Sequence, residues 1–353
     1  MRTKTFAGID AFRMIAAFMV VAIHISPFSV WNQDVDYLIT YCLGRIAVPF
    51  FLMTTGYFVL APYVRSGFKR KYPIRKYFVK NIGLYLMATL LYLPIVIYSK
   101  KMPHGIMGLL KQVFFDGTFY HLWYFPAVII GCALLMFLIK KSMRAAIIFS
   151  FVAYVIGLFG DSYYGIVKGI PWLKTIYGAI FSISSYTRNG IFFAPIFILL
   201  GILAAMPRYR CRKQVCKIGC VVSLILMLAE GLLIYHFKIQ RHHSMYLFLI
   251  PTTYFLFQLL LFIRGKVPSW FRSGSMFIYL IHPAVIILVR GIAKAAKLTE
   301  ILVDHTFVQY IVVCILSLLM ISWIPIQNLL KRREKNVSKR KSLGGTESSS
   351  SGT

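Results

Sequence analysis

The chain has 353 residues, of which 59% are hydrophobic and only 14% charged, and its formal net charge is +30. Soluble domains contain about 25% charged residues, so this composition excludes an ordinary soluble protein and indicates that most of the chain lies in a membrane. A charge this positive would by itself suit a nucleic-acid partner, but the basic residues lie between apolar segments. We therefore expect the lipid bilayer, and no nucleic acid, as a partner.

Stretches of about 17 to 25 mostly apolar residues predict transmembrane helices. Taken in chain order, they lie at 11–31, 37–61, 78–99, 121–139, 145–160, 189–206, 218–236, 246–263, 275–293 and 306–329. Lys and Arg cluster in alternate connections, at 65–80, 140–144, 208–217, 264–272 and 331–341. By the positive-inside rule, this alternation predicts a multi-pass protein of the cell membrane with both termini in the cytoplasm. The expected fold is all-α, with about ten transmembrane helices.

The end of the chain differs in composition from the rest. Residues 331–341 are basic, and 342–353 are rich in Ser and Gly. Such a segment cannot bury a core, so we expect residues 1–330 to form the transmembrane domain and 331–353 a disordered cytoplasmic tail or linker. No Cys-x-x-Cys pair suggests zinc, so we expect no metal.

Arg13 and His24 lie in the first apolar stretch, where an ionisable residue is costly and indicates a functional site. The two are eleven positions apart. At about 100° and 1.5 Å per residue, they share one helix face and lie about 16 Å apart along it. One face of this helix therefore carries a cation near its start and an imidazole deep in the bilayer. Asp10 precedes Arg13 by three residues and can pair with it.

Other polar residues interrupt the apolar stretches. Arg45 and Thr55 flank Pro49, and a proline inside a membrane frees backbone groups that only a protein-lined or wet cavity can satisfy. His121 and Trp123 begin the fourth stretch, where they belong either to a site or to the aromatic belt at the membrane surface.

Later stretches contain further polar residues. Arg188 begins the sixth stretch after an outer connection of nearly thirty residues, and His282 lies in the middle of the ninth. Glu230 and His236 stand alone in the seventh stretch, and we expect them to be structural.

Four segments together carry a resemblance to a known family. They are Arg13 to His24, Arg45 to Tyr57, His-Leu-Trp-Tyr-Phe at 121–125 and Tyr-Leu-Ile-His-Pro at 279–283. In this order they resemble the acyltransferase-3 family of bacterial membrane O-acyltransferases over residues 6 to 330. The resemblance implies a helical bundle that transfers an acyl group, expected to be acetyl, from cytoplasmic acyl-CoA to an extracytoplasmic hydroxyl on an envelope glycan or small molecule.

The resemblance also implies roles for individual residues. His24 is the expected general base, and Arg13, with Asp10 beside it, holds an anionic part of the donor or forms an ion pair. Family members place two arginines three apart at the start of the third helix, where this chain has Lys80 and Gly83. A lysine binds phosphate as a point charge, without the bidentate fork of arginine. The expected substrate- and donor-binding residues are Arg45, Thr55, Lys80, His121, Trp123, Arg188 and His282.

Within the family, the chain resembles the membrane half of the vancomycin-resistance membrane serine racemases. The resemblance rests on residues 120–127, 160–162, 187–193 and 244–249. In those proteins a cytoplasmic pyridoxal-phosphate racemase domain follows the membrane part, and this sequence stops before such a domain. We therefore expect no pyridoxal phosphate in this chain, which is either a truncated fusion or a free-standing relative, and a racemase domain, fused or separate, is a candidate partner.

Three functions are compatible with these residues. The first is acyl transfer. The second is a non-catalytic module that binds or admits L-serine and passes it to a cytoplasmic racemase, since Arg and His side chains suit a carboxylate as well as a thioester. In the third, the buried cations and histidines only support the packing of a structural membrane protein, at a cost of several kcal/mol in uncompensated polar burial.

The topology can be tested with a fusion. A reporter attached after Thr353 is expected to give a cytoplasmic signal, because the predicted helices bring both ends of the chain to the basic side. An extracytoplasmic signal would contradict the predicted number of spans.

Overall fold

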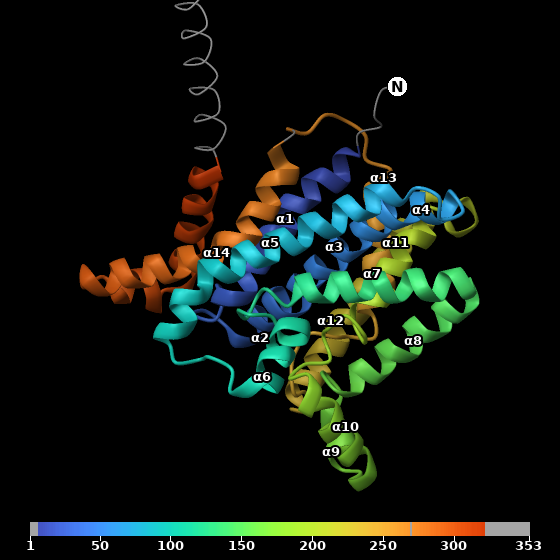
Figure 1. Cartoon of the computed structure of the whole chain (residues 1–353). Coiled ribbons are helices and arrows are strands. Elements are labelled where there is room, and N and C mark those ends of the chain that lie inside the picture. Colours follow the sequence, from blue (N-terminus) through green and yellow to red (C-terminus); the bar gives the residue numbers. More distant parts are fainter. Residues whose placement is uncertain (1–5, 269, 322–353) are drawn as a thin grey trace, which may run out of the picture.

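The computed structural model describes residues 6–268 and 270–321, and this part of the chain is helical throughout, without a β-strand (Figure 1). The first half contains α1 (Ala7–Ile25), α2 (Gln33–Asp36), α3 (Ala47–Thr55), α4 (Ala61–Arg65), α5 (Lys71–Tyr98), α6 (Gly105–Lys111), α7 (Tyr124–Lys141) and α8 (Met143–Phe159). The second half contains α9 (Tyr164–Lys168), α10 (Pro171–Ile183), α11 (Ala194–Ala204), α12 (Lys213–His236), α13 (Leu249–Leu261), α14 (Trp270–Ala295) and the helix Thr306–Ile321.

The expected all-α class is confirmed. Among the described residues, six helical segments are long and apolar enough to cross a membrane: α1, Gln33–Arg65, α5, α7, α12 and α14. Four shorter apolar helices are α8, α11, α13 and Thr306–Ile321. Each expected stretch overlaps one of these helices. The number of helices that cross the membrane, and the side on which the termini lie, stay predictions. The tail predicted at 331–353 lies outside the described residues.

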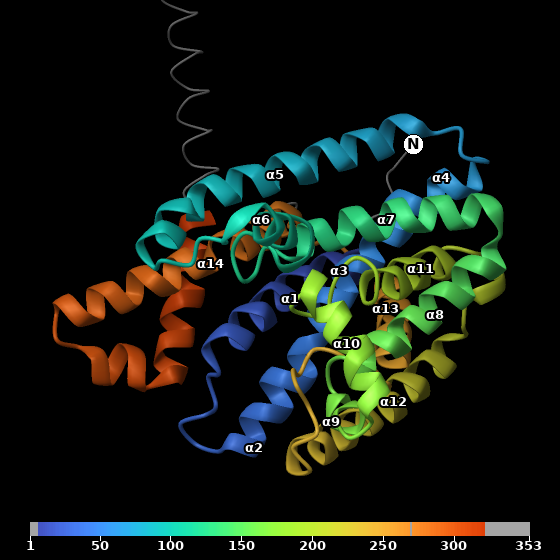
Figure 2. The same cartoon turned by 60° about the horizontal axis from the view of Figure 1, so that its bottom comes forward.

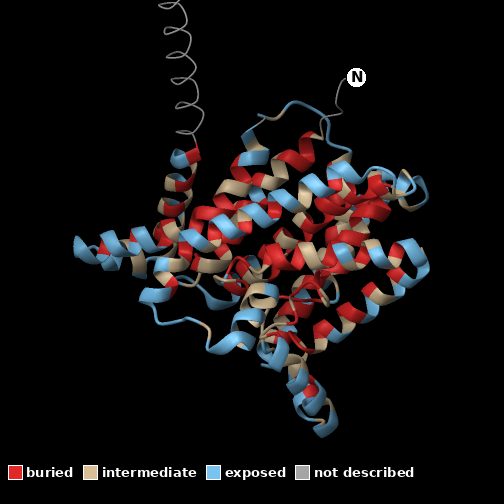
Figure 3. Cartoon of the chain, in the orientation of Figure 1, coloured by how far each residue is buried: buried red, intermediate tan, exposed pale blue. Residues whose placement is uncertain are grey.

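Helix α1 lies inside the bundle, where it packs against α3, α13 and α14 (Figure 2). Buried residues concentrate along these inner helices, whereas the outward sides of α5, α8 and α12 are exposed (Figure 3). Many of the exposed side chains on those outer helices are large and apolar, as a lipid-facing surface requires. They include Leu86, Leu90 and Leu91 of α5, Ile148 and Phe151 of α8, and Val221 and Ile225 of α12.

The second apolar segment changes its helical geometry several times. A π-helical turn (Tyr37–Cys42) and a 3-10 turn (Leu43–Ile46) precede α3, and another π-helical turn (Gly56–Leu60) follows it. Such turns are frequent at functional sites. The 3-10 turn contains Arg45 and ends just before the first turn of α3, which contains Pro49.

Lone polar residues also support the fold. Glu230 of α12 accepts hydrogen bonds from the backbone N–H groups of Leu247 (2.6 Å) and Phe248 (3.0 Å), which precede α13. It also accepts one from the hydroxyl of Tyr163 (2.8 Å). A carboxylate beside the N-terminus of α13 satisfies backbone donors that the helix itself leaves unpaired. Glu230 thus joins three segments and is structural, as expected.

Two glycines allow α3 and α11 to cross closely. A Cβ at Gly201 of α11 would overlap the backbone of Met53, and a Cβ at Gly56 would overlap the backbone of Ile198. Small residues permit such close approach in membrane helix pairs, where packing rather than the hydrophobic effect drives association. This crossing fixes the segment that carries Arg45 and Thr55 against the centre of the bundle.

Gly201→Ala is expected to lower the free energy of unfolding by about 1 to 3 kcal/mol, because the added methyl group separates two backbones. Thermal denaturation of the purified protein in detergent measures the effect. Gly291→Ala in α14 is the matched control, since nothing lies within 4 Å of its Cβ position. Equal melting temperatures for the two variants would contradict the proposed close crossing.

Candidate active site

A cavity of about 590 Å³ lies between α1, α3, α5, α7 and α14. Three residues predicted from the sequence line it: Arg13 from α1, Thr55 from α3 and Lys80 from α5. Arg272 from α14 lines it as well. We call this the basic cavity, after its cations Arg13, Lys80 and Arg272. Their three helices are far apart in the sequence, and their convergence on one space is typical of a site for an anionic ligand.

Asp10 determines how the cations of the basic cavity are paired. It accepts two hydrogen bonds from Arg272, at 2.8 Å from Nε and 2.7 Å from Nη2, whereas its closest approach to Arg13 is 3.7 Å. The Nε atom of Arg13 is buried and has no hydrogen-bond partner in the described structure. Asp10 is therefore engaged mainly by Arg272, which leaves hydrogen-bonding capacity of Arg13 for a ligand.

Arg272 was not predicted as a site residue. It lies 262 positions from Asp10. The sequence showed it only as one of several basic residues before the ninth apolar stretch, where the positive-inside rule already explains a cation. Arg272 lines the same cavity as Lys80 of α5. The cavity therefore has a second cation, although α5 has Gly83 where family members have an arginine.

Three histidines from different segments form a second group, which we call the histidine cluster: His24, His121 and His282. The ring centroid of His282 lies 5.3 Å from that of His24 and 5.2 Å from that of His121. The ring of Tyr120 lies 4.8 Å from His24. His121 and His282 are fully buried, whereas His24 is half-buried. The rings of His24 and His282 are stacked rather than directed at a common point.

Several nitrogen atoms of the cluster remain unpaired. The Nδ1 atom of His282 donates to the backbone carbonyl of Tyr279 at 2.9 Å, and its Nε2 atom has no partner in the described structure. Both ring nitrogens of His121 are also buried without a described partner. Since an unpaired buried polar atom is costly, these atoms indicate a place for a ligand or water.

Tyr279 connects the two groups. It lines the basic cavity, and its ring lies 5.5 Å from that of His121. Its hydroxyl donates a hydrogen bond to the backbone carbonyl of His121. The basic cavity and the histidine cluster therefore share a wall, which Tyr279 forms with Tyr124, 5.6 Å from it between ring centroids.

Two arginines lie close to the histidine cluster. Arg188 and Arg45 both interact electrostatically with His24. The guanidinium of Arg188 lies over the rings of Trp123 (5.2 Å) and Tyr186 (4.5 Å). The Nε atoms of both arginines are buried without a hydrogen-bond partner among the described residues. Stacking on aromatic faces holds such cations in a low-dielectric site while their donors stay free.

Asp161 belongs to the same region, although the sequence placed it only in the outer connection. Its Oδ1 atom accepts backbone hydrogen bonds from Ser244 (2.7 Å) and Met245 (3.1 Å). Its Oδ2 atom is buried and lacks a partner in the part of the chain described. Arg188 and Arg45 interact with it electrostatically. The sequence shows only a single acid between Gly160 and Ser162, which by itself identifies no role.

Arg45 also acts on His243, in the connection between α12 and α13. Burial, together with the charge of Arg45, lowers the pKa of His243 to about 4, so this histidine is neutral at physiological pH. It lies 3.2 Å from the hydroxyl of Tyr37, between Nδ1 and the phenol oxygen. His243 therefore adds no positive charge to that of Arg45.

The predicted site residues thus fall into two adjoining groups. Arg13, Thr55 and Lys80 line the basic cavity, whereas Arg45, Trp123 and Arg188 surround the histidine cluster. The described residues contain no group of three or more His, Cys, Asp or Glu side chains that is arranged to hold a metal ion. The expected absence of a metal stays a prediction, and so do the catalytic roles of His24, Arg13 and Asp10.

Comparison with known families identifies the fold. A family model described as an acyltransferase domain, that of the acyltransferase-3 family, matches residues 6–324. The chain belongs to the acyltransferase-3 family. The resemblance seen in the sequence is therefore confirmed, and the protein is a multi-pass membrane protein of this family. No solved structure matches the chain.

Three curated relatives are similar to the chain. An amino-acid racemase of Enterococcus faecalis is 41% identical over 326 residues, which cover 90% of this chain and 45% of the relative. A serine/alanine racemase of Enterococcus gallinarum is 37% identical over 317 residues, covering 88% and 45%. A second amino-acid racemase of Enterococcus faecalis is 37% identical over 345 residues, covering 95% and 47%. The chain spans about half the length of these relatives.

Arg272→Gln is expected to lower the free energy of unfolding by about 1 kcal/mol, because it removes two charge-assisted hydrogen bonds of a partly exposed pair. The measurement is thermal denaturation in detergent. Adding Asp10→Asn is expected to cost less than the sum of the single changes, since both remove the same interaction. Lys266→Gln is the control. Additive effects of Asp10→Asn and Arg272→Gln would contradict the pairing.

Proposed function

We propose that the chain transfers an acyl group, expected to be acetyl, from a cytoplasmic acyl-CoA to an extracytoplasmic hydroxyl. Membership of the acyltransferase-3 family supports this reaction class. The observation that carries the proposal is the arrangement of the basic cavity and the histidine cluster on either side of Tyr279. An anionic donor held in the cavity would direct its thioester toward His24.

Helix α1 determines the distance between the basic cavity and the histidine cluster. It contributes Arg13 to the basic cavity and His24 to the histidine cluster, about 16 Å farther along the helix. A donor with a charged end and a long flexible arm can bridge such a distance, whereas a compact acyl donor cannot. Arg13, Lys80 and Arg272 would bind phosphates of the donor through charge-assisted hydrogen bonds.

The reaction needs a base that removes the proton of the acceptor hydroxyl next to the thioester. In the proposed step, His24 takes the proton of the acceptor hydroxyl as the oxygen forms a bond to the thioester carbonyl carbon. The bond between that carbon and sulfur then breaks, and the departing thiolate takes the proton from His24. The products are an ester and a free thiol. Arg188 and Arg45 would stabilise the negative charge that develops on the carbonyl oxygen.

A second function is favoured by the unpaired groups around Asp161. An α-amino acid carries a carboxylate and an ammonium group, which would pair with Arg45 or Arg188 and with the Oδ2 atom of Asp161. The relatives named as amino-acid and serine/alanine racemases make L-serine the probe of choice. In this alternative the chain binds or admits L-serine for a cytoplasmic racemase, fused to it or separate.

The transferase proposal is tested by the release of free thiol from acetyl-CoA by the protein in lipid nanodiscs, with an extract of envelope glycans as acceptor. His24→Asn is expected to reduce turnover by at least about 100-fold, because it removes the base but keeps a polar side chain. His305→Asn is the matched control, since His305 is exposed and lies outside the histidine cluster. Undiminished turnover in His24→Asn would exclude His24 from the mechanism.

The two functions are distinguished by direct binding. Stabilisation of the folded protein by acetyl-CoA, weakened in Lys80→Gln, is the expected result for a transferase. Stabilisation by L-serine alone would instead favour the serine-binding module. In that case Asp161→Asn or Arg188→Gln is expected to lower the affinity for L-serine by at least about tenfold. Lys238→Gln, an exposed change in the connection between α12 and α13, is the control for the loss of positive charge.

A further inference from the structure

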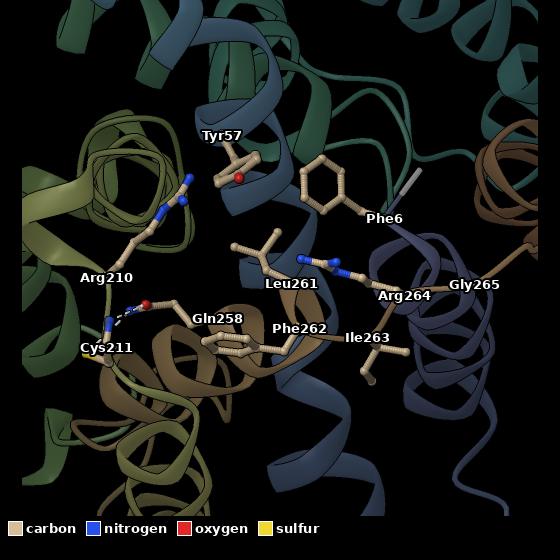
Figure 4. Close-up of a pocket in the computed structure, with 10 residues that line it drawn as sticks. All are labelled: Phe6, Tyr57, Arg210, Cys211, Gln258, Leu261, Phe262, Ile263, Arg264 and Gly265. Carbon is tan, nitrogen blue, oxygen red and sulfur yellow. Dashed lines mark hydrogen bonds between the residues drawn. The ribbon is translucent and has the colours of Figure 1, made fainter. Parts of the chain in front are cut away.

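A second cavity, of about 600 Å³, lies at the end of α13 (Figure 4). Its walls come from the start of α1, the turn after α3, the connection between α11 and α12, and the connection between α13 and α14. We call it the α13 pocket. Its lining includes Phe6, Tyr57, Arg210, Gln258 and Arg264. Neither proposed function uses any of these residues.

The α13 pocket contains two cations without a counter-charge. Its lining includes Arg210 and Arg264 but no acidic residue. Neither arginine forms an ion pair among residues 6–268 and 270–321. Figure 4 shows the two guanidinium groups extending from opposite walls toward the space between them. Two fork-shaped donors around an unfilled space are suited to a phosphate group, which accepts hydrogen bonds on several oxygens.

The wall that carries Arg210 is fixed by α13. Gln258 is buried, and its Oε1 atom accepts a hydrogen bond from the backbone N–H of Cys211 at 2.8 Å. The hydroxyl of Tyr254 donates to the backbone carbonyl of Tyr209 at 2.7 Å. These bonds hold the residues on both sides of Arg210, so its backbone is positioned before a ligand arrives.

The opposite wall is fixed as well. The backbone N–H of Gly8 donates to the carbonyl of Ile263 at 3.4 Å, and a Cβ at Gly8 would overlap the backbone of Leu260. The start of α1 therefore lies directly against the end of α13. This contact places Phe6 and Arg264 on the same cavity.

Apolar side chains continue from the arginines along the end of α13. Phe262 and Ile263 line the pocket and are 43% and 49% exposed, although both are large hydrophobic residues. An exposed apolar surface next to two arginines, at the end of a helix in a membrane protein, is the arrangement expected for a lipid whose headgroup and chains are bound together.

We propose that the α13 pocket binds a phosphate group carried on an apolar molecule, and that an anionic phospholipid supplies it. Arg210 and Arg264 bind the phosphate, and Phe262 and Ile263 contact the first part of the acyl chains. A soluble nucleotide presents the same phosphate chemistry and is the alternative source. The pocket and the basic cavity share no lining residue, and the rings of Phe6 and Tyr57, which line the pocket, contact the ring of Phe58, which lines the basic cavity, edge to face.

Cys211 provides a readout that does not depend on enzymatic activity. It lines the pocket and is partly exposed. The rate of N-ethylmaleimide modification at Cys211 is measured by peptide mass spectrometry, with the protein in phosphatidylcholine nanodiscs. Phosphatidylglycerol is then added in steps, and the expected result is slower modification of Cys211.

Two double variants distinguish binding in the α13 pocket from a general effect of positive charge on this side of the protein. Arg210→Gln with Arg264→Gln is expected to raise the phosphatidylglycerol content needed for half-maximal protection by about tenfold. Arg212→Gln with Lys266→Gln is the matched control, because it removes the same charge from neighbouring exposed positions outside the pocket. Equal melting temperatures of the two double variants exclude a folding defect.

The outcomes assign the source of the phosphate or overturn the proposal. Protection of Cys211 by ADP in pure phosphatidylcholine, without protection by phosphatidylglycerol, would mean that the pocket binds phosphate but that a soluble nucleotide, not a lipid, supplies it. The absence of protection by both, or equal protection in the two double variants, would overturn the proposal. None of these outcomes depends on acyl transfer or serine binding, so failure here leaves the proposed function standing.

Discussion

The structure depends on the pairing of polar groups inside an apolar bundle. A charged or polar side chain buried in a membrane protein is stable only when another group accepts or donates its hydrogen bonds. Asp10 and Arg272 satisfy this requirement with two hydrogen bonds, and Glu230 does so by holding the segment that precedes α13. Such pairs join segments distant in the sequence and position the helices that carry the candidate site.

Several of the buried polar groups that lack such a partner lie at the candidate site. Arg13, Arg45, Arg188, His121 and His282 all have buried nitrogen atoms without a partner in the described structure. They come from separate helices and connections, yet they belong to the basic cavity or lie in or near the histidine cluster, the two groups that Tyr279 connects. A native protein retains such costly groups at sites where a ligand completes the hydrogen bonds. The pairing of Asp10 with Arg272 is itself part of this arrangement, because it leaves Arg13 for a ligand.

The basic cavity also accounts for a departure from the family pattern. Where family members place two arginines on the third helix, this chain has Lys80 and Gly83. The structure brings Arg272 from α14 to the same cavity, so two cations still face one space, but from two helices. Asp10 already occupies the Nε and Nη2 atoms of Arg272, so Arg272 contributes its charge to the cavity, whereas the buried Nε atom of Arg13 has no described partner.

The sequence alone determined the helical class, the approximate position of each apolar helix, the shared face of Arg13 and His24, and the family. These depend on hydropathy and helical periodicity, which are local properties. Only the tertiary structure decided that Arg272 pairs with Asp10, that Asp161 lies near Arg188, and that Arg210 and Arg264 share a pocket. A basic residue before a helix has the same local signature whether it marks topology or binds a ligand. What distinguishes the two is which distant side chains surround it, and helix packing alone determines that.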